Sequence, residues 1–363
     1  MASIRKRENG QWRARYRDDA GKEHARHFAR KVDAQRWLDE TTASVVTGTY
    51  VDPKAGAVTF RDYAEQWRAV QVHRPSSQAH VETMLRRHVY PTLGDRKLSS
   101  ILPSDVQTLV KRLDLAPATV GVIHSIVSGV MRAAAVRDRR VVANPCEGTK
   151  LPKVDRKSVV PLTTDQVETV RAAMPAHLRA LVTLAAGTGM RQGECFGLTV
   201  DRLDFLRRTV TVDRQLVTVP RRTYLAPPKT AASVRTIPLP QVVVDAMAAH
   251  LAAFPASEAG FVFTLGGKPI SRSAFGHLWR SVAREAGLST GTGLHSMRHY
   301  YASLLIRHGE SVKVVQARLG HASAAETLDT YSHMWPDSDD RTREAIDSVL
   351  GPLADSVRTD DAL

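Results

Sequence analysis

The sequence predicts a multidomain chain: a small α+β domain at the N-terminus, an all-α domain, and a mixed α/β, mainly α, domain at the C-terminus. The length of 363 residues exceeds what one compact domain usually holds. Apolar residues alternate with a period of two near the N-terminus and recur at helical spacing after residue 59. Stretches with proline, glycine or basic residues, at 41–57 and 147–160, separate these patterns. We therefore expect domains over residues 1–45, 57–146 and 160–350.

The N-terminal domain shows the two faces of a β-strand. Apolar side chains alternate over residues 12–16 with a row of cationic ones, Arg13, Arg15 and Arg17. Turn signals flank this strand at 9–10 and 19–21, a second strand is expected around 24–28, and a helix from about residue 31. Residues 1–31 hold ten Arg or Lys against four Asp or Glu, which fits either a solvated surface or a DNA-binding sheet.

The middle domain shows four stretches of helical spacing with basic exposed faces. Thr59 is the expected N-cap of the first, because apolar residues at helical spacing follow it. The second is expected over 76–88 and should stop at Tyr90-Pro91, since proline cannot continue a helix. The third begins near Ser104 and the fourth covers 118–137.

The C-terminal domain mixes helices with short strands. Residues 163–166 form a capping box that opens a helix through Met174. Further helices are expected over 177–186, 242–251, 273–286, 295–308, 311–319 and 340–350, the last followed by an acidic tail. Strands are expected over 210–219 and 230–239, joined by a basic loop with Arg221 and Arg222, and over 261–264.

The charge of the chain favours a polyanionic partner. The formal net charge is +14 and the pI is about 10.1, which points first to nucleic acid and second to an acidic membrane. Residues 1–10 lack the apolar stretch of a secretory signal, and no run of 18 apolar residues predicts a transmembrane helix. Cys146 and Cys195 show neither metal-ligand nor disulfide spacing, so we expect reduced thiols in a cytoplasmic protein.

Two boxes in the C-terminal domain could bind phosphate. Arg191 stands where a helix begins after a glycine-bearing turn, so a phosphate there would meet a guanidinium fork and backbone N–H groups. His295 and Arg298 lie one helical turn apart on the same face. Each has an ordinary alternative, because Arg191 could be a surface residue and the His-x-x-Arg spacing also occurs at residues 27–30 and 277–280.

Three further residues are candidates only in combination. Lys229 follows two prolines at an expected hairpin tip, where a lysine is usually solvated. His321 follows Leu319-Gly320 at a helix end and could simply cap that helix. Tyr331 follows ten residues later and could be a core aromatic side chain.

Taken in order, these boxes resemble the catalytic signature of the tyrosine recombinase (phage integrase) family. The resemblance covers residues 163–335 and includes the Thr-Gly-Met-Arg-Gln-Gly-Glu run, the lysine, His-x-x-Arg-His, Leu-Gly-His and the tyrosine. Residues 57–146 resemble the family's helical core-type DNA-binding domain. Residues 1–45 resemble, less specifically, its small arm-type DNA-binding domain, with Arg13, Arg15 and Arg17 as candidate DNA contacts.

The resemblance implies a role for each residue. Arg191 and Arg298 would hold the non-bridging oxygens of the scissile phosphate, where charge accumulates in the transition state. His295 and His321 would donate or relay protons, and Lys229 would protonate the leaving 5′ oxygen.

The remaining roles concern the nucleophile and its surroundings. Tyr331 would form a covalent 3′-phosphotyrosine, and Glu194 would support the helix that carries the first arginine. Tyr300 and Tyr301 are rival tyrosines, but we expect them to pack against the protein. Because the covalent link keeps the energy of the broken bond, religation needs no nucleotide, and no cofactor or metal is implied.

The implied function is site-specific integration and excision of a mobile element by a homotetramer on double-stranded DNA attachment sites of core and arm types. An excision factor or a host bending protein would be a further partner, and no membrane is involved. Two alternatives stay open: a topoisomerase-like enzyme of the same chemistry, against which the N-terminal domain argues, and a catalytically idle DNA-binding or architectural protein.

Overall fold

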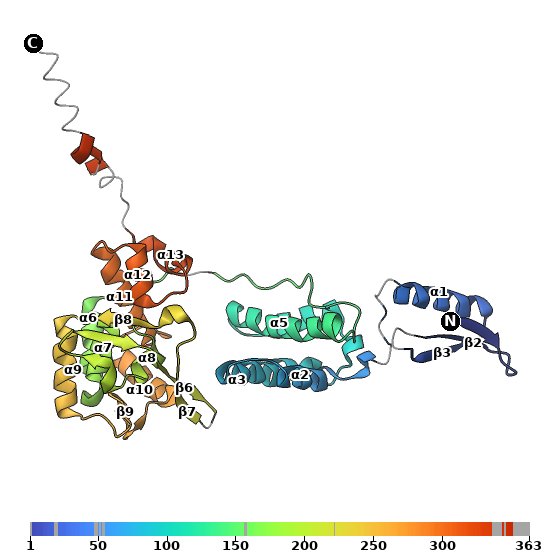
Figure 1. The fold of residues 1–363 in the computed structure, drawn as a ribbon, viewed down its shortest axis with the longest axis horizontal. Helices are drawn as coiled ribbons and strands as arrows, with labels where there is room; N and C mark the ends of the chain where they lie inside the picture. Colours follow the sequence, from blue (N-terminus) through green and yellow to red (C-terminus); the bar gives the residue numbers. More distant parts are fainter. Residues whose placement is uncertain are drawn as a thin grey trace, which may run out of the picture. The chain divides into compact units, whose positions relative to one another are not determined.

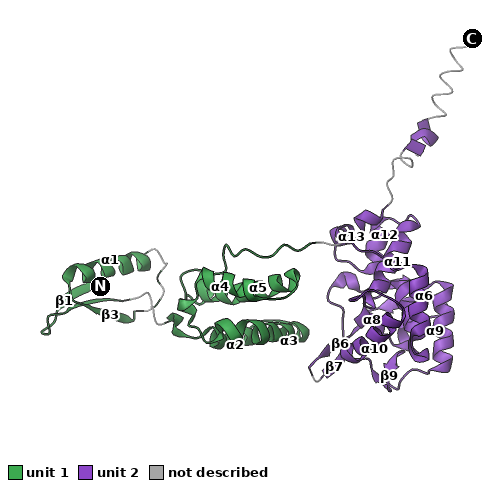
Figure 2. Cartoon of the chain, turned by 180° about the vertical axis from the view of Figure 1, so that it is seen from behind, with its two compact units in different colours: residues 1–155 green, residues 156–363 purple. Residues whose placement is uncertain are grey.

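The computed structural model divides into two compact units, residues 1–155 and 156–363 (Figure 2). The residues it describes are 2–17, 21–46, 50, 52, 55–155, 158–220, 222–335, 343–344 and 346–350. The first unit contains a small sheet with one helix and then a helical bundle. The second contains the mixed α/β part that carries the candidate catalytic residues.

The first unit begins with a three-stranded antiparallel sheet covered by one helix (Figure 1). The central strand β2 (Trp12–Arg17) pairs with β1 (Ser3–Lys6) and with β3 (Glu23–Phe28), and α1 (Lys31–Val46) packs against β2 and β3. Ala14 and Tyr16 are buried, as are Ala34 and Leu38 of the helix. The expected alternation along β2 is therefore confirmed.

A helical bundle follows in the same unit. Its helices are α2 (Phe60–Ala69), α3 (Pro75–Met84) with a π-helical continuation (Leu85–Gly94), α4 (Pro103–Arg112) and α5 (Pro117–Arg132) with a π-helical continuation (Ala133–Arg137). Single 3₁₀ turns lie at Ala55–Ala57 and Leu98–Ser100. Thr59 caps α2 as expected, since its side chain accepts the backbone N–H of Asp62.

The expectation that the second helix stops at Pro91 is wrong. The chain stays helical to Gly94 because it widens to a π-helix, with Pro91 inside it. Proline within an α-helix costs about 3 kcal/mol, through a lost hydrogen bond and a ring clash. Leu85, Val89 and Leu93 are buried in the bundle on the same segment. Each buried aliphatic side chain contributes about 1.5–3 kcal/mol, so their packing outweighs the cost of the proline.

One helix of this bundle has the length and composition of a membrane span. It runs over Pro117–Arg137 and thus comprises α5 and its continuation. Val120, Ile123, Val127 and Val130 of this helix are fully or almost fully buried in the bundle. The core of the bundle therefore accounts for one apolar face of this helix, while Val122 and Val136 on it are exposed.

The second unit is mainly helical (Figure 1). Its helices are α6 (Thr164–Ala173), α7 (Arg179–Thr188), α8 (Gln192–Phe196), α9 (Gln241–Ala253), α10 (Arg272–Glu285), α11 (His295–Arg307), α12 (Val312–Leu319) and α13 (Ala324–Tyr331). Single 3₁₀ turns lie at Ala176–Leu178, Val200–Arg202, Ala231–Ser233 and Ser332–Met334. The expected capping box at residues 163–166 is present, and Gly320 ends α12 with a left-handed conformation.

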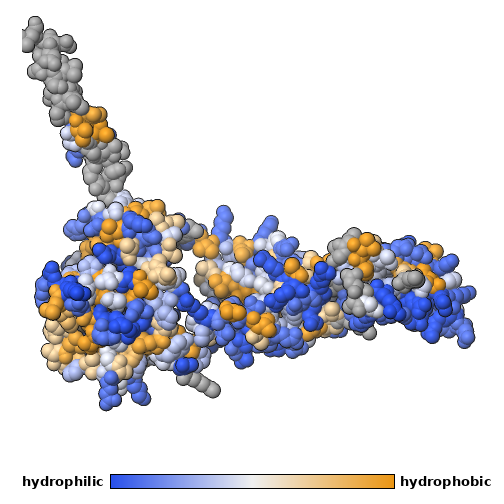
Figure 3. All heavy atoms as spheres, viewed as in Figure 1, coloured by the Kyte–Doolittle hydropathy of each residue, from blue (hydrophilic) through white to orange (hydrophobic). Residues whose placement is uncertain are grey.

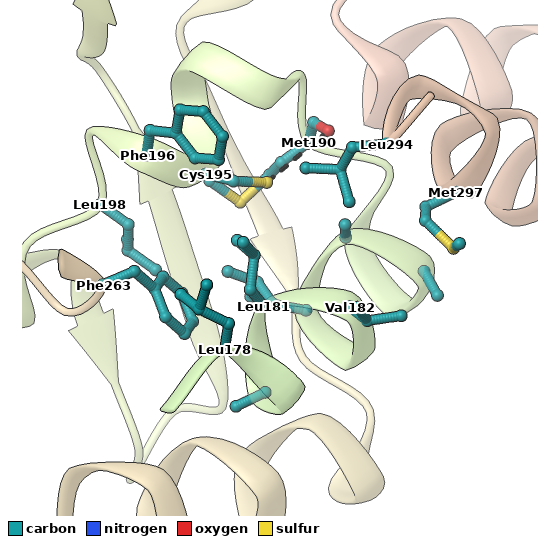
Figure 4. Close-up of a cluster of buried hydrophobic side chains, with 14 of the residues drawn as sticks. Leu178, Leu181, Val182, Met190, Cys195, Phe196, Leu198, Phe263, Leu294 and Met297 are labelled. Carbon is teal, nitrogen blue, oxygen red and sulfur yellow. Dashed lines mark hydrogen bonds between the residues drawn. The ribbon is translucent and has the colours of Figure 1, made fainter. Parts of the chain in front are cut away.

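The core of the second unit surrounds α7, which packs against α6, α8, α9 and α11. Figure 4 shows Leu181 and Val182 of α7 together with Cys195, Phe196 and Phe263 from other segments. These side chains are all at most 3% exposed. Helices α8 and α11 both pack against α7. This packing holds the residues at the N-terminal ends of α8 and α11 in fixed positions.

The strands of the second unit depart from the sequence-based expectation. A three-stranded antiparallel sheet has the order β4 (Leu203–Asp204), β5 (Thr209–Val212) and β8 (Arg235–Pro238). A separate hairpin pairs β6 (Gln215–Val219) with β7 (Arg222–Ala226), and a second one pairs β9 (Thr264–Leu265) with β10 (Lys268–Pro269). The strand expected over 261–264 is observed as the two-residue strand β9, which begins at Thr264. Phe261 forms only an isolated bridge with Thr199.

The long strand expected over 210–219 is in fact two strands with different partners. It is broken at Asp213, whose carboxylate accepts Arg202 Nε at 2.8 Å and Arg214 Nε at 2.9 Å. The chain then enters the β6–β7 hairpin. Of the two arginines expected in a basic loop, Arg222 begins β7, and Arg221 lies outside the described residues. Of the helix expected over 340–350, residues 343–344 and 346–350 are helical; the rest of that stretch and the acidic tail lie outside the described residues.

Candidate active site

The turn between α7 and α8 positions Arg191. Gly189 ends α7 with φ 62°, and a Cβ at this position would collide with the Tyr301 ring. Only glycine combines a left-handed conformation with so close an approach. Arg191 is then the N-cap of α8, as the sequence predicts, and its backbone N–H donates to Glu194 Oε2 at 2.8 Å. That N–H is thus already paired, so of the two groups that the sequence suggests for phosphate, the guanidinium is the one that could bind it.

The Glu194 carboxylate joins two arginines inside the protein. It is 2% exposed and accepts Arg191 Nη1 at 3.0 Å and Arg235 Nη2 at 2.8 Å. Arg235 also donates to the Arg318 and Ser233 carbonyl oxygens. Burial raises the pKa of Glu194, but the hydrogen bonds and charge of Arg235, followed by Arg191, more than compensate and hold it below the usual range.

We expect Glu194→Ala to lower the free energy of unfolding by about 3–5 kcal/mol, because it leaves buried guanidinium charge unpaired. The matched control is Glu168→Ala, which removes the exposed partner of Arg171 and should cost less than about 1 kcal/mol. Urea unfolding of the full chain measures both. Since the pKa of Glu194 is lower in the folded protein, its contribution is complete above the ordinary glutamate pKa and lost as the pH falls through the lowered one. Equal losses in the two variants would contradict the network.

Helix α11 brings His295 and Arg298 to the same region. The Arg298 side chain is buried, and its Nη1 donates to the Gly189 carbonyl oxygen at 2.8 Å. Burial, and then the charge of Arg191, lowers the pKa of Arg298 to about 9, so it stays charged at neutral pH. His295 is exposed at the first position of the helix. Partial desolvation by the surrounding protein, followed by the charges of Arg298 and Arg191, lowers the pKa of its imidazole.

The end of α12 places His321 beside the first arginine. Arg191 Nη2 donates to the Gly320 carbonyl oxygen at 3.0 Å, so the left-handed turn that precedes the histidine is tied to the guanidinium. The His321 ring is buried, and its Nδ1 lies 2.7 Å from Thr327 Oγ1. Burial, followed by the charge of Arg298, lowers its pKa to about 4, which makes it neutral at neutral pH.

Tyr331 ends α13 and lies between two histidines. Its side chain is 1% exposed, and its hydroxyl lies 2.8 Å from His299 Nδ1. The His321 ring stacks on the Tyr331 ring with centroids 6.4 Å apart and an interplanar angle of 10°. Burial raises the pKa of Tyr331 to about 12, partly offset by the nearby charge of Arg298.

Lys229 does not lie at a hairpin tip, and that expectation is wrong. The turn of the β6–β7 hairpin comes earlier, because β6 pairs with β7 and not with β8. Lys229 is exposed in the loop that joins β7 to β8. In this loop Thr230 Oγ1 lies 2.9 Å from Ser233 Oγ, which accepts Arg191 Nη1 at 3.4 Å. The lysine therefore belongs to the same loop as the serine that contacts the Arg191 side chain.

The rival tyrosines pack as the sequence predicts. Tyr300 is 8% exposed, and its hydroxyl lies 3.0 Å from Thr164 Oγ1. Tyr301 is 7% exposed, and its ring lies against Gly189. Burial raises the pKa of Tyr301. Both tyrosines thus serve the packing of α11 against its neighbours.

The arginines of the N-terminal sheet are partly engaged in ion pairs. Arg13 Nη2 lies 3.2 Å and Arg15 Nη1 3.5 Å from the Glu23 carboxylate on the neighbouring strand. Arg17 is exposed. In Figure 3 the visible surface of this sheet and helix is largely hydrophilic. An anionic partner would compete with Glu23 for two of the three arginines.

Two residues of the site escaped the sequence-based assignment. The sequence pattern predicts no role for Arg235 or His299, although His299 forms part of the His-x-x-Arg-His box and lies one helical turn after His295. Helix α13 was missed as well. Its signal was Ser323 followed by Glu326, a capping pattern in which the serine accepts the Glu326 N–H at 3.3 Å.

Family models of phage integrases match three consecutive parts of the chain. The phage integrase N-terminal domain matches residues 2–47, the phage integrase central domain residues 60–150, and the phage integrase family model residues 161–337. The chain belongs to the tyrosine recombinase (phage integrase) family. The expected fold class is thus confirmed, and this tyrosine recombinase is a site-specific DNA-rearranging enzyme of the integrase kind.

Relatives and solved structures resemble this recombinase over most of its length. The prophage phiRv2 integrase of Mycobacterium tuberculosis is 28% identical, with 97% of this chain and 96% of that protein covered. The Tn1549 transposon integrase, in complex with a circular intermediate DNA, is 23% identical with a TM-score of 0.68, over 80% and 99% of the two chains. A lambda integrase tetramer bound to a Holliday junction is 17% identical, with a TM-score of 0.59, over 89% and 96%.

Proposed function

We propose that this recombinase cleaves a DNA strand by attack of the Tyr331 hydroxyl on a phosphate held by Arg191 and Arg298. The observation that carries the proposal is the convergence of five segments on one place: the start of α8, the β7–β8 loop, α11, the end of α12 and α13. Direct contacts join three of these places, from Ser233 to Arg191 and from Arg191 to Gly320. Helix α11 joins them through the Arg298 hydrogen bond to the Gly189 carbonyl oxygen. Helix α13 joins through the contact of Tyr331 with His299.

The electrostatics of the site support this chemistry. A phosphodiester accumulates negative charge on its non-bridging oxygens during displacement, and preorganised guanidinium groups stabilise that charge best where water is excluded. Arg298 is almost fully buried and Arg191 is half-buried, and both are fixed by backbone carbonyl oxygens before substrate arrives. In this proposal His295 and His321 donate or relay protons at the phosphate, and Glu194 positions Arg191.

The reaction breaks the bond from phosphorus to the 5′ oxygen and leaves a 3′-phosphotyrosine. Lys229 is the proposed general acid, giving its proton to the departing oxygen. Its place on the exposed loop beside Arg191 supports this role, since a DNA backbone that meets the guanidinium also meets that loop. Religation is the reverse displacement by a 5′ hydroxyl, so no bond energy is lost between the two steps.

The proposed substrate is double-stranded DNA with paired attachment sites, and the proposed assembly on it is a homotetramer. The lambda integrase structure contains a tetramer on a Holliday junction, which supports an assembly with the same number of subunits. Residues 57–146 would bind core-type sites and residues 1–45 arm-type sites. An excision factor or a host bending protein would determine whether the enzyme integrates or excises the mobile element. The reaction would take place on DNA in the bacterial cytoplasm.

A nicked duplex tests the proposal. Duplexes that the wild-type protein retains covalently are first selected from a random-sequence library. A nick beside the mapped cleavage site then lets the short 5′-hydroxyl fragment diffuse away, so an active enzyme accumulates as a covalent adduct. We expect this adduct to survive denaturation. Retention of DNA only under native conditions would instead identify an idle DNA-binding protein.

The N-terminal arginines are expected to bind phosphates of a separate DNA site. Replacing Arg13, Arg15 and Arg17 together by alanine should weaken binding to arm-type duplexes and leave core-type binding unchanged. For every phosphate that the variant no longer neutralises, the slope of log affinity against log salt should fall by about 0.9. Salt titrations with duplexes selected for binding without cleavage measure this slope. Identical slopes in the two proteins would contradict a DNA-binding sheet.

A further inference from the structure

The histidine next to Arg298 has no role in the function proposed above. His299 lies on the face of α11 that carries His295, and the two rings meet edge to face with centroids 4.8 Å apart. Its Nδ1 lies 2.8 Å from the Tyr331 hydroxyl oxygen, within hydrogen-bonding distance. The His299 ring is half-buried and meets the Tyr331 ring at 62°. The imidazole is thus aimed at the atom that would attack phosphorus.

The other two histidines of the site are differently engaged. His321 lies flat against the face of the Tyr331 ring, its Nδ1 is next to Thr327 Oγ1, and its Nε2 is 3.9 Å from Glu326 Oε1. His295 packs edge to face against the His299 ring. Within the part of the chain that the structure describes, His299 is therefore the histidine hydrogen-bonded to the nucleophile.

The protonation state of His299 suits a proton acceptor. Burial, followed by the electrostatic interactions with His295 and Arg298, lowers its pKa to about 4, so the ring is neutral at neutral pH. A neutral imidazole has one nitrogen that accepts a proton, and the tyrosine hydroxyl donates to Nδ1 when the ring proton is on Nε2. A bound phosphate would neutralise part of the arginine charge and make His299 more basic at the moment of reaction.

We propose that His299 is the general base that removes the proton from the Tyr331 hydroxyl during cleavage. The proton moves from Oη to Nδ1 as the Oη–P bond forms and the bond from phosphorus to the 5′ oxygen breaks, while the departing oxygen takes its proton from Lys229. In religation the imidazolium returns the proton to the tyrosine oxygen. This role rests on Tyr331 being the nucleophile, as proposed above.

The His299→Asn variant distinguishes a general base from a residue that only positions the Tyr331 hydroxyl by a hydrogen bond. The amide oxygen of asparagine lies near the position of Nδ1 and keeps a hydrogen-bond acceptor there, but it cannot take up a proton. We expect adduct formation on the nicked duplex to slow by about 10² to 10⁴, the usual contribution of general base catalysis. The control is His277→Asn, in an exposed His-x-x-Arg pair on α10, which should react at the wild-type rate.

A more acidic nucleophile supplies the decisive comparison. Fluorinated tyrosine placed at position 331 ionises more readily and depends less on a base. The loss of adduct-formation rate caused by H299N should then become smaller by about tenfold or more, following the Brønsted dependence. The loss of rate caused by Lys229→Ala should stay the same. If H299N melts at a lower temperature than wild type, His299→Gln replaces it in the same comparison.

The outcomes separate the two proposals. An adduct at wild-type rate in H299N, or a defect that fluorination leaves unchanged, would overturn the role of His299 as a base. A fluorotyrosine enzyme with His299 intact that forms no adduct at position 331 would instead overturn the assignment of the nucleophile.

Discussion

Tyr331→Phe is expected to bind the selected duplex with wild-type affinity and to form no covalent adduct at all. Removal of one oxygen deletes the only atom of this side chain that can attack phosphorus. The ring stays, so its stacking on His321 and its burial persist. The lost hydrogen bond to His299 costs about 1–3 kcal/mol of stability, which affects folding far less than it affects chemistry. Electrophoresis of denatured reactions on nicked DNA measures the adduct.

Tyr300→Phe is the matched control for this change. It removes the hydroxyl of another buried tyrosine, whose partner Thr164 is exposed and can bond to water instead, so it should cost less stability and leave adduct formation unaffected. If Tyr331→Phe traps DNA as well as wild type, or if Tyr300→Phe abolishes trapping, the nucleophile has been assigned wrongly.

Lys229→Ala should cleave more slowly by about 10² to 10⁴ while binding DNA nearly as wild type does. The reason is that the 5′ oxygen is a poor leaving group unless it receives a proton as it departs. The side chain is exposed and Glu194 is paired by Arg191 and Arg235, so we expect the variant to fold as wild type does. Single-turnover cleavage of the selected duplex gives the rate.

A sulfur substrate distinguishes proton donation from phosphate positioning. When sulfur replaces the bridging 5′ oxygen, the leaving group needs no proton. Lys229→Ala should then recover most of its lost rate, whereas Arg191→Ala, which loses charge stabilisation, should recover little. Equal deficits of Lys229→Ala on oxygen and sulfur substrates would show that the lysine only positions the phosphate.

Local patterns in the sequence predicted most of the fold. The N-caps at Thr59 and Thr163 and the helix end at Gly320 depend on neighbours within four residues, so the sequence alone is enough to find them. The alternation of β2 is equally local. The order of the catalytic boxes also needs no structure, because a family signature is a one-dimensional pattern.

The errors arose where distant residues decide the outcome. Pro91 continues a helix because the bundle core buries its neighbours, and propensity alone contains no information on that packing. The sequence predicts Lys229 on a hairpin tip because residues 210–219 look like one strand, yet β5 and β6 pair with different strands. Strand partners are long-range choices that alternation does not reveal.

The same limit applies to the site. Its arginines and histidines could be picked out by their resemblance to the family's ordered boxes, but the link from Glu194 to Arg235 spans 41 residues and depends on how the chain folds back between them. The contact of His299 with Tyr331 likewise joins residues on two helices that are 32 positions apart. A histidine beside a signature arginine gives no sequence signal of a hydrogen bond to the nucleophile.

Mapping the covalent attachment tests the central claim most directly. The adduct of full-length wild-type protein with the nicked duplex is digested with protease and nuclease, and the peptide that carries the nucleotide is sequenced by mass spectrometry. We expect a single modified residue, Tyr331, linked through a 3′ phosphate. A label on Tyr300 or Tyr301, a 5′ linkage, or an adduct that still forms in Tyr331→Phe would contradict the account.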